Sequence, residues 1–199
     1  MTKILKGYVL INTDVGQEKD VMASLEELPG VKEVHLLAGE FDVLAELELE
    51  TKLGPINLVN PDEKVIAFVT EKMRKVPGIR RTRTVIPVAG SSEEKDQVEE
   101  TEKTRKGFVF IETKPGKETK VTNELMKIPE VHEVHLITGS KDLLAVVWVQ
   151  KYIYPYQAEI MAIVTNQIQK INGIVRTDTC ISEQANRASA VPQVAVQRS

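Results

Sequence analysis

The sequence contains a single cysteine, Cys180, among 199 residues, so no disulfide can form within the chain and a reducing compartment is indicated. Cys180 has no histidine or acid at a known catalytic spacing, which favours a small core residue over a reactive thiol. Basic residues are not in excess, because 26 Lys and Arg face 29 Asp and Glu and the net charge is −3. Such a chain does not attract a phosphate backbone, so we expect no direct nucleic-acid partner.

Long hydrophobic runs and nucleotide or hydrolase motifs are also missing. No apolar run approaches the roughly 18 residues of a membrane span, and the N-terminal MTKILKGYVLINT lacks a signal-peptide pattern. The sequence has no P-loop, GxSxG, HExxH or CxxC motif. We therefore expect a soluble cytoplasmic protein with no membrane partner, no catalytic residues, no cofactor and no enzyme activity.

The sequence contains one duplicated segment. Residues 7–45 align without a gap with residues 107–145, and the match resumes around the second helix after repeat two has lost about five residues. The residues shared at equivalent positions of the gapless stretch include Gly7/Gly107, Val9/Val109, Thr13/Thr113, Gly16/Gly116, Val21/Val121, Leu25/Leu125, Pro29/Pro129, Glu33/Glu133, Val34/Val134, His35/His135, Leu36/Leu136, Gly39/Gly139 and Asp42/Asp142. A period of this size indicates a duplicated domain rather than a solenoid repeat.

Composition places the boundaries of these domains. We predict a first domain at residues 1–88, a charged linker at 89–106, a second domain at 107–183 and a flexible tail at 184–199. The linker has too little apolar content for a core, and its Glu and Lys residues favour partial helix. The tail has no hydrophobic periodicity.

Apolar spacing predicts the order strand, helix, strand, strand, helix, strand in each repeat. The first helix ends at Pro29 or Pro129, and the second helix of repeat one is expected to begin at Asn60 and Pro61. The expected strands are residues 8–13, 31–37, 42–49 and 79–87 in repeat one, and 108–113, 131–137, 142–149 and 174–182 in repeat two.

Several of these strands are apolar on both faces, as in the run from Asp142 to Val149. A sheet with helices on one side only should alternate apolar and polar residues. A second cover is therefore required, and a second copy of the unit in the same chain can supply it. We predict that the two domains pack sheet to sheet as an intramolecular pseudo-dimer, with the linker long enough to allow it.

The turns between the second and third strands are the main functional candidates. They read Gly39-Glu-Phe-Asp42 and Gly139-Ser-Lys-Asp142. Glycine permits close backbone approach or positive φ, the exposed amides of the turn can hold a carboxylate, and the aspartate can receive an ammonium group. The alternative is a tight turn in which the aspartate fixes the backbone. The predicted ligand-binding residues are Gly39, Glu40, Asp42, Gly139, Ser140 and Asp142.

Three other features are weaker candidates. His35 and His135 occupy matched positions, either as buried interface histidines or beside the ligand pocket. His132 and His135 resemble a metal pair, but residues three apart in a strand point to opposite faces, so we expect no metal there. The basic cluster fits a solvated strand edge, and its members are Arg74, Arg80, Arg81 and Arg83.

Taken in order, these residues resemble the effector-binding domain of the Lrp/AsnC family, also called the RAM domain. The family pattern is a Gly-aromatic strand start, a helix ending at Pro-x-Val, the turn Thr-Gly-x-x-Asp and a closing Pro-Gly-Val/Ile-x-x-Thr-x-Thr. In repeat one it is carried by Gly7-Tyr8, Pro29-Gly-Val31, Ala38-Gly39-x-x-Asp42 and Pro77-Gly78-Ile79-x-x-Thr82-x-Thr84. In repeat two it is carried by Gly107-Phe108, Pro129-Glu-Val131, Thr138-Gly139-x-x-Asp142 and Gly173-Ile174-x-x-Thr177-x-Thr179.

The resemblance implies an α+β fold of two ferredoxin-like βαββαβ domains of the dimeric α/β-barrel type. It also implies dimers that associate further, and small effectors, usually amino acids, bound near the Gly-x-x-Asp turn. Two departures stand out: Gly7 follows Met1 too closely for the family's helix-turn-helix, and both halves of the dimer are fused. Ala38 also replaces the usual Thr.

The expected function is a stand-alone amino-acid-binding and oligomerisation module without its own DNA-binding domain. Its expected partners are a small effector, further copies of the chain and DNA-binding regulators of the Lrp/AsnC type. One alternative is a structural or interaction protein that assembles without a ligand. Another is an enzyme, because ferredoxin-like dimers also include small oxygenases, but no catalytic constellation in the sequence supports this.

Overall fold

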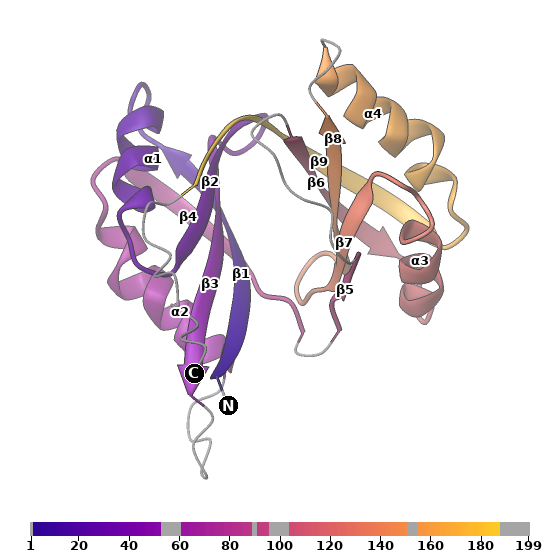
Figure 1. Ribbon diagram of the computed structural model, residues 1–199, viewed down its shortest axis with the longest axis horizontal. Coiled ribbons are helices and arrows are strands. Elements are labelled where there is room, and N and C mark those ends of the chain that lie inside the picture. The colour runs from indigo at the N-terminus through magenta and orange to yellow at the C-terminus, as the bar shows by residue number, and fades with distance from the viewer. Residues whose placement is uncertain (1, 53–60, 89–90, 96–103, 151–154, 188–199) are drawn as a thin grey trace, which may run out of the picture. The chain divides into compact units, whose positions relative to one another are not determined.

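The computed structural model of the protein describes residues 2–52, 61–88, 91–95, 104–150 and 155–187 (Figure 1). Both repeats have the predicted order of elements. In repeat one these are β1 (Thr2–Thr13), α1 (Glu18–Glu26), β2 (Val31–Ala38), β3 (Val43–Lys52), α2 (Pro61–Glu71), the 3-10 turn η1 (Met73–Lys75) and β4 (Ile79–Val85). In repeat two they are β6 (Thr104–Thr113), α3 (Glu118–Leu125), β7 (Val131–Leu136), β8 (Leu143–Gln150), α4 (Tyr156–Asn166), η2 (Ile168–Lys170) and β9 (Ile174–Arg187).

The chain divides into two compact units that do not coincide with the two predicted domains. The first unit comprises residues up to Leu36, residues 42–84 and residues from Ala185, and the second comprises residues 37–41 and 85–184. In the first unit the repeat-one strands follow the order β4-β1-β3-β2, and in the second the order is β9-β6-β8-β7-β5. The neighbours β1–β3 and β6–β8 pair antiparallel over ten and eight residues. Sheet-to-sheet packing of the repeats stays a prediction.

Each unit places its helices on one face of its strands. Figure 1 shows α1 and α2 against the strands of repeat one, and α3 and α4 against those of repeat two. In the second unit this face is a core that alternate strand residues share with the apolar stripes of α3 and α4. The buried members include Val109, Ile111, Val121, Leu125, Val134, Ala145, Ile160 and Ile168.

Glycine at the start of each repeat allows a helix to pack closely on the sheet. A Cβ added to Gly107 would lie 2.7 Å from Ile160 Cγ2 of α4, and one added to Gly7 would lie 3.0 Å from Val65 Cγ1 of α2. A larger side chain at either position would push the helix outward. Close packing of the helix therefore explains why glycine occupies this position of the Gly-aromatic pattern in both repeats.

The opposite faces of the repeat-two strands carry another set of buried side chains. Phe108, Phe110, Leu144 and Val146 are all buried, although none belongs to the core beneath the helices. His135 is buried with them. The repeat-two strands therefore bury apolar side chains on both faces, including the face that an alternating strand would give to water.

The predicted linker includes a short strand, and its role as a tether stays a prediction. Within its described part lies β5 (Glu93–Glu94), which pairs antiparallel with Val134 and Glu133 of β7, and no helix. The pairing continues where Lys95 N donates to His132 O at 3.0 Å. An edge strand such as β7 exposes backbone groups that need partners, and β5 supplies them.

β9 continues to Arg187 and so includes the first four residues of the predicted tail, and its last residues belong to the first unit. There Asn186 Nδ2 donates a hydrogen bond of 2.7 Å to Glu26 Oε1, which follows from β9 running beyond the second unit. The predicted N-cap Asn60 lies outside the described residues. Among the helices that the structure describes, none combines the length and apolar character needed to span a membrane.

Candidate functional site

The two Gly-x-x-Asp turns connect β2 to β3 and β7 to β8 and have open surroundings. Gly39 has φ of +137° and Gly139 has φ of +126°, a region that side chains rarely adopt. An added Cβ at either glycine would meet nothing within 4 Å. The glycines are therefore required by the backbone conformation of an exposed turn and not by close packing. Glu40 and Ser140, the next residues, are also exposed.

The aspartate that closes each turn is anchored to the end of the first strand of its repeat. Asp42 Oδ2 accepts hydrogen bonds from Thr13 N at 2.8 Å and from Thr13 Oγ1 at 3.3 Å. Asp142 Oδ2 accepts the same pair from Thr113, at 2.7 and 3.1 Å. These bonds fix the turn to the sheet, as the tight-turn interpretation required. They all end on Oδ2, so Oδ1 of each carboxylate has no hydrogen-bond partner within the described part of the chain.

The two turns differ in the residue before the aspartate. Phe41 is buried and apolar, whereas Lys141 is buried and charged. Lys141 Nζ lies 3.0 Å from Asp178 Oδ2 and 3.5 Å from Glu112 Oε2. The hydrogen bond from Lys141 holds the pKa of the Asp178 carboxyl below its ordinary value. The residue before the aspartate is therefore a buried member of an ion-pair cluster in the second turn and a buried aromatic ring in the first.

A buried polar cluster lies on the strands that lead into and out of each turn. In repeat one, His35 Nε2 is 2.9 Å from Glu46 Oε1 and 3.6 Å from Glu33 Oε2, and all three side chains are buried. Glu33 on β2 and Glu46 on β3 are direct cross-strand partners. The three groups can each offer one ligand atom within 4.8 Å of the others, a geometry that could hold a metal ion.

The equivalent cluster in repeat two uses different partners. His135 Nε2 is 3.0 Å from Glu133 Oε2, and His135 Nδ1 is 2.8 Å from Ser92 Oγ. Val146 stands where repeat one has Glu46, and the third carboxylate near His135 is that of Glu94 on β5. The sequence pointed to both histidines, and Glu33 and Glu133 lie two residues before them on the same strand face. It missed Glu46 and Glu94, because the pairing of neighbouring strands that brings them to the histidines is not visible in one strand.

His132 and His135 do not act together. His132 stacks on Trp148 with ring centroids 4.4 Å apart, whereas His135 meets Glu133 and Ser92. Burial lowers the pKa of His132, and the positive charge of Lys95 lowers it further. The two histidines thus have separate environments.

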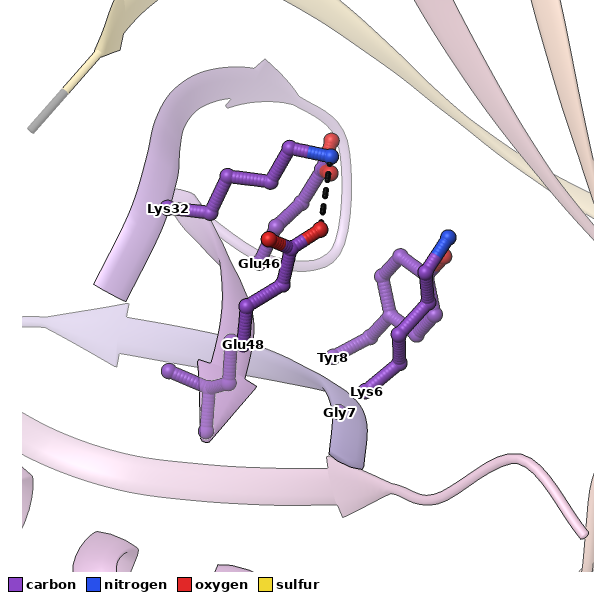
Figure 2. Close-up of a pocket in the computed structure, with 7 residues that line it drawn as sticks. Lys6, Gly7, Tyr8, Lys32, Glu46 and Glu48 are labelled. Atoms are coloured by element: carbon purple, nitrogen blue, oxygen red, sulfur yellow. Dashed lines mark ion pairs between the residues drawn. The ribbon is translucent and has the colours of Figure 1, made fainter. Parts of the chain in front are cut away.

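A shallow hollow lies beside the repeat-one cluster. Figure 2 shows Lys6 and Tyr8 on one side of it and Glu46, Glu48 and Lys32 on the other. Lys32 Nζ forms an ion pair of 2.9 Å with Glu48 Oε1. One hundred residues later the same two positions hold the stacked pair His132 and Trp148. The repeats have therefore diverged from an ion pair to an aromatic contact.

Three of the four clustered arginines line a second hollow around β4. Its lining residues are Arg74, Ile79, Arg80, Arg81 and Thr82. Arg74 Nε donates to Thr82 Oγ1 at 2.9 Å, and in repeat two Gln169 Nε2 donates to Thr177 Oγ1 at 2.8 Å. Because an uncharged residue makes the same contact, the Arg74 bond belongs to the fold. Arg80 and Arg81 are exposed, as expected of a solvated strand edge.

Comparison with known proteins identifies the second repeat. The model of the Lrp/AsnC ligand binding domain matches residues 106–186. An HTH-type transcriptional regulator of Pyrococcus furiosus is 31% identical over 90 residues, which are 44% of this chain and 53% of the regulator. The chain thus spans about half the length of this curated relative.

Two solved structures add to the comparison. A protein of Pyrococcus horikoshii is 32% identical over 42% of this chain and 89% of its own, with a TM-score of 0.35. The siroheme decarboxylase NirDL, in complex with an iron-uroporphyrin III analogue, covers 92% of this chain and 72% of its own with a TM-score of 0.61. Its identity is 11%, so this likeness concerns the fold alone.

Proposed function

We propose that the chain, whose residues 106–186 match the Lrp/AsnC ligand binding domain, is an effector-binding and oligomerisation module that recognises an amino acid at its Gly-x-x-Asp turns. The proposal assigns no catalytic step to the chain. It concerns a regulatory role of the kind implied by relatives that are HTH-type regulators of transcription.

The proposal is supported by the different surroundings of the two carboxylate oxygens in each aspartate. Oδ2 of Asp42 is occupied by Thr13, and Oδ2 of Asp142 by Thr113. The other oxygen of each carboxylate is free to receive an ammonium group. The neighbouring turn is exposed and its glycine has positive φ, and we propose that this turn receives the carboxylate end of the ligand. A zwitterion presents both of these charges, which a neutral metabolite does not.

The two turns should bind with different affinity. In repeat one Glu40 and Asp42 offer two carboxylates beside Phe41, which favours the ammonium end of a ligand. In repeat two Lys141 is already paired with Asp178 and Glu112, so its charge is largely compensated. We propose that repeat one holds the stronger site.

Assembly is the second part of the proposed function. We propose that copies of the chain associate with one another, and that DNA-binding regulators of the same family are further partners. The family resemblance supports both points. The net charge of −3 supports a role through protein contacts and not through contact with a phosphate backbone.

The test is a thermal-shift screen of the full chain against the twenty amino acids, followed by calorimetry with each hit. A ligand that binds only the folded state raises the melting temperature by mass action. We expect Asp42→Asn to weaken binding more than Asp142→Asn, because repeat one is proposed to hold the stronger site. In each variant the amide keeps the contact with threonine but loses the charge. The amino-acid site would be refuted by a screen without a hit. It would also be refuted if the variant with both Asp42→Asn and Asp142→Asn bound the ligand as tightly as the parent protein.

A second candidate function is a structural module that assembles without a ligand. The observation that favours it is the anchoring of both aspartates to Thr13 and Thr113, which explains the Gly-x-x-Asp pattern without any effector. Size measurement separates the two. An effector module should change its association state with the hit from the screen, whereas a structural module should keep one state under all conditions.

A further inference from the structure

The buried cluster of Glu33, His35 and Glu46 brings two carboxylates and one imidazole together. Glu33 and Glu46 face each other across the β2–β3 pair, at 3% and 5% exposure. Like charges placed directly opposite on a sheet destabilise it, and burial increases the cost. One oxygen of each carboxylate lies within 3.6 Å of the same atom, His35 Nε2, so the three groups can face a single bound ion.

The distances in the cluster match those between ligands of a small divalent ion. Zinc binds imidazole nitrogen and carboxylate oxygen at about 2.0–2.2 Å in a tetrahedron, which places neighbouring ligand atoms about 3.3 Å apart. The observed separations from His35 Nε2 are 2.9 Å to Glu46 and 3.6 Å to Glu33. Shifts of a few tenths of an ångström, available to side chains alone, would seat the ion.

We propose that Glu33, His35 and Glu46 form a binding site for a divalent transition metal such as zinc. The donors are one imidazole nitrogen and carboxylate oxygens, the ligand types that zinc and related ions accept. Three protein ligands leave a fourth position for water or a small anion. The site is separate from the Gly-x-x-Asp turn, so it neither requires nor follows from amino-acid binding.

Repeat two provides the internal comparison. His135 sits at the matched position, but Val146 replaces Glu46 and Ser92 Oγ takes His135 Nδ1. Its third carboxylate, Glu94, is exposed and comes from the other neighbouring strand. An exposed ligand is strongly hydrated and easily displaced, so the site of high affinity is assigned to repeat one.

The experiment uses the full chain, stripped of metal with a chelator and titrated with zinc in a calorimeter. We expect one tightly bound equivalent per chain. Glu46→Gln preserves the shape of the cluster, and Glu46→Val reproduces repeat two; each should weaken binding at least tenfold, as should His35→Gln. His135→Gln is the matched control and should leave the tight equivalent in place.

Cobalt is the spectroscopic probe of the same site. Cobalt bound by one imidazole and carboxylates should give visible absorption bands of a tetrahedral centre without a thiolate band, and the spectrum should survive Cys180→Ala. Absence of tight binding would overturn the proposal. Binding that persists in folded Glu46→Gln and His35→Gln, or that is lost in His135→Gln, would also overturn it.

Discussion

Asp142 Oδ2 accepts hydrogen bonds from both the backbone N and the side-chain Oγ1 of Thr113, at 2.7 and 3.1 Å. Asp42 and Thr13 repeat this arrangement. The aspartate therefore joins the end of the first strand to the start of the third, across the turn proposed to bind the effector. The same aspartate side chain is expected to affect both the stability of the fold and the binding of the effector. Variants must therefore distinguish a loss of stability from a loss of binding.

Asp142→Ala should lower the free energy of unfolding by about 1.5–3 kcal/mol, because it removes hydrogen bonds to a charged acceptor. Thr113→Val removes only the Oγ1 contact and should cost about 0.5–1.5 kcal/mol. Asp142→Asn should cost less than Asp142→Ala, since its amide oxygen can still accept from Thr113 N. Urea denaturation of the three variants measures these differences. An alanine variant as stable as the parent would show that the bond to Thr113 contributes nothing.

Gly107→Ala should destabilise the second unit by about 1–3 kcal/mol, because the new methyl would lie against the stiff Ile160 side chain, whose Cγ2 is 2.7 Å away. Gly7→Ala should cost less, since Val65 Cγ1 is 3.0 Å away. Ile160→Leu removes the branch at Cβ and should relieve part of the cost of Gly107→Ala. Thermal denaturation of the double-mutant cycle tests this. Additive losses in the double variant would contradict the proposed clash.

His132 should make the protein less stable in acid. Its pKa is lowered in the folded state from the ordinary value of 6.5, so the unfolded chain binds the proton more readily. The stability that the neutral ring contributes is present above the unfolded pKa and is lost as the pH falls through the folded pKa. Unfolding measured between neutral and mildly acidic pH should show a smaller loss in His132→Gln than in the parent.

Lys95→Met should raise the pKa of His132, because the positive charge of Lys95 is the second cause of its depression after burial. NMR titration of the His132 ring measures the shift directly. Trp148 is the only tryptophan in the sequence and stacks on His132, so its fluorescence reports the same titration. An unchanged midpoint in Lys95→Met would exclude the electrostatic effect.

Cutting the chain within residues 96–103 should leave the two fragments associated. The N-terminal fragment ends in β5, which belongs to the sheet of the second unit, and the C-terminal fragment carries the end of β9, which belongs to the first. Size-exclusion chromatography after cleavage at an engineered protease site tests this. Two separate, folded fragments would contradict it, and removal of residues 185–199 should weaken the association.

The sequence predicts the order of elements because each repeat combines clear helical and strand periodicities with glycine and proline at their ends. Its strand limits are less accurate. β1 begins at Thr2 and not at Tyr8, since Lys3 and Lys6 interrupt the apolar pattern while the backbone continues to pair with β3. Strands pair through backbone hydrogen bonds, so the pattern of apolar side chains does not show where the pairing ends.

The site was predictable only where it is local in sequence. The Gly-x-x-Asp turns are contiguous and were identified from their glycine and aspartate. The cluster of Glu33, His35 and Glu46 depends on the register between β2 and β3, and Glu46 alone reads as a solvent-facing strand residue. The polar end of β9 was assigned to a tail for a similar reason, because its partner strand lies far away in the sequence.

The passage of the last strand into the first unit imposes an order in time. The ribosome completes Thr84 about 100 residues before Ala185, a delay of roughly 5–20 s at typical rates of synthesis. Throughout that interval the first unit is held without its final strand. A chain truncated before Ala185 would therefore lack part of the first unit, although most of that unit is made first.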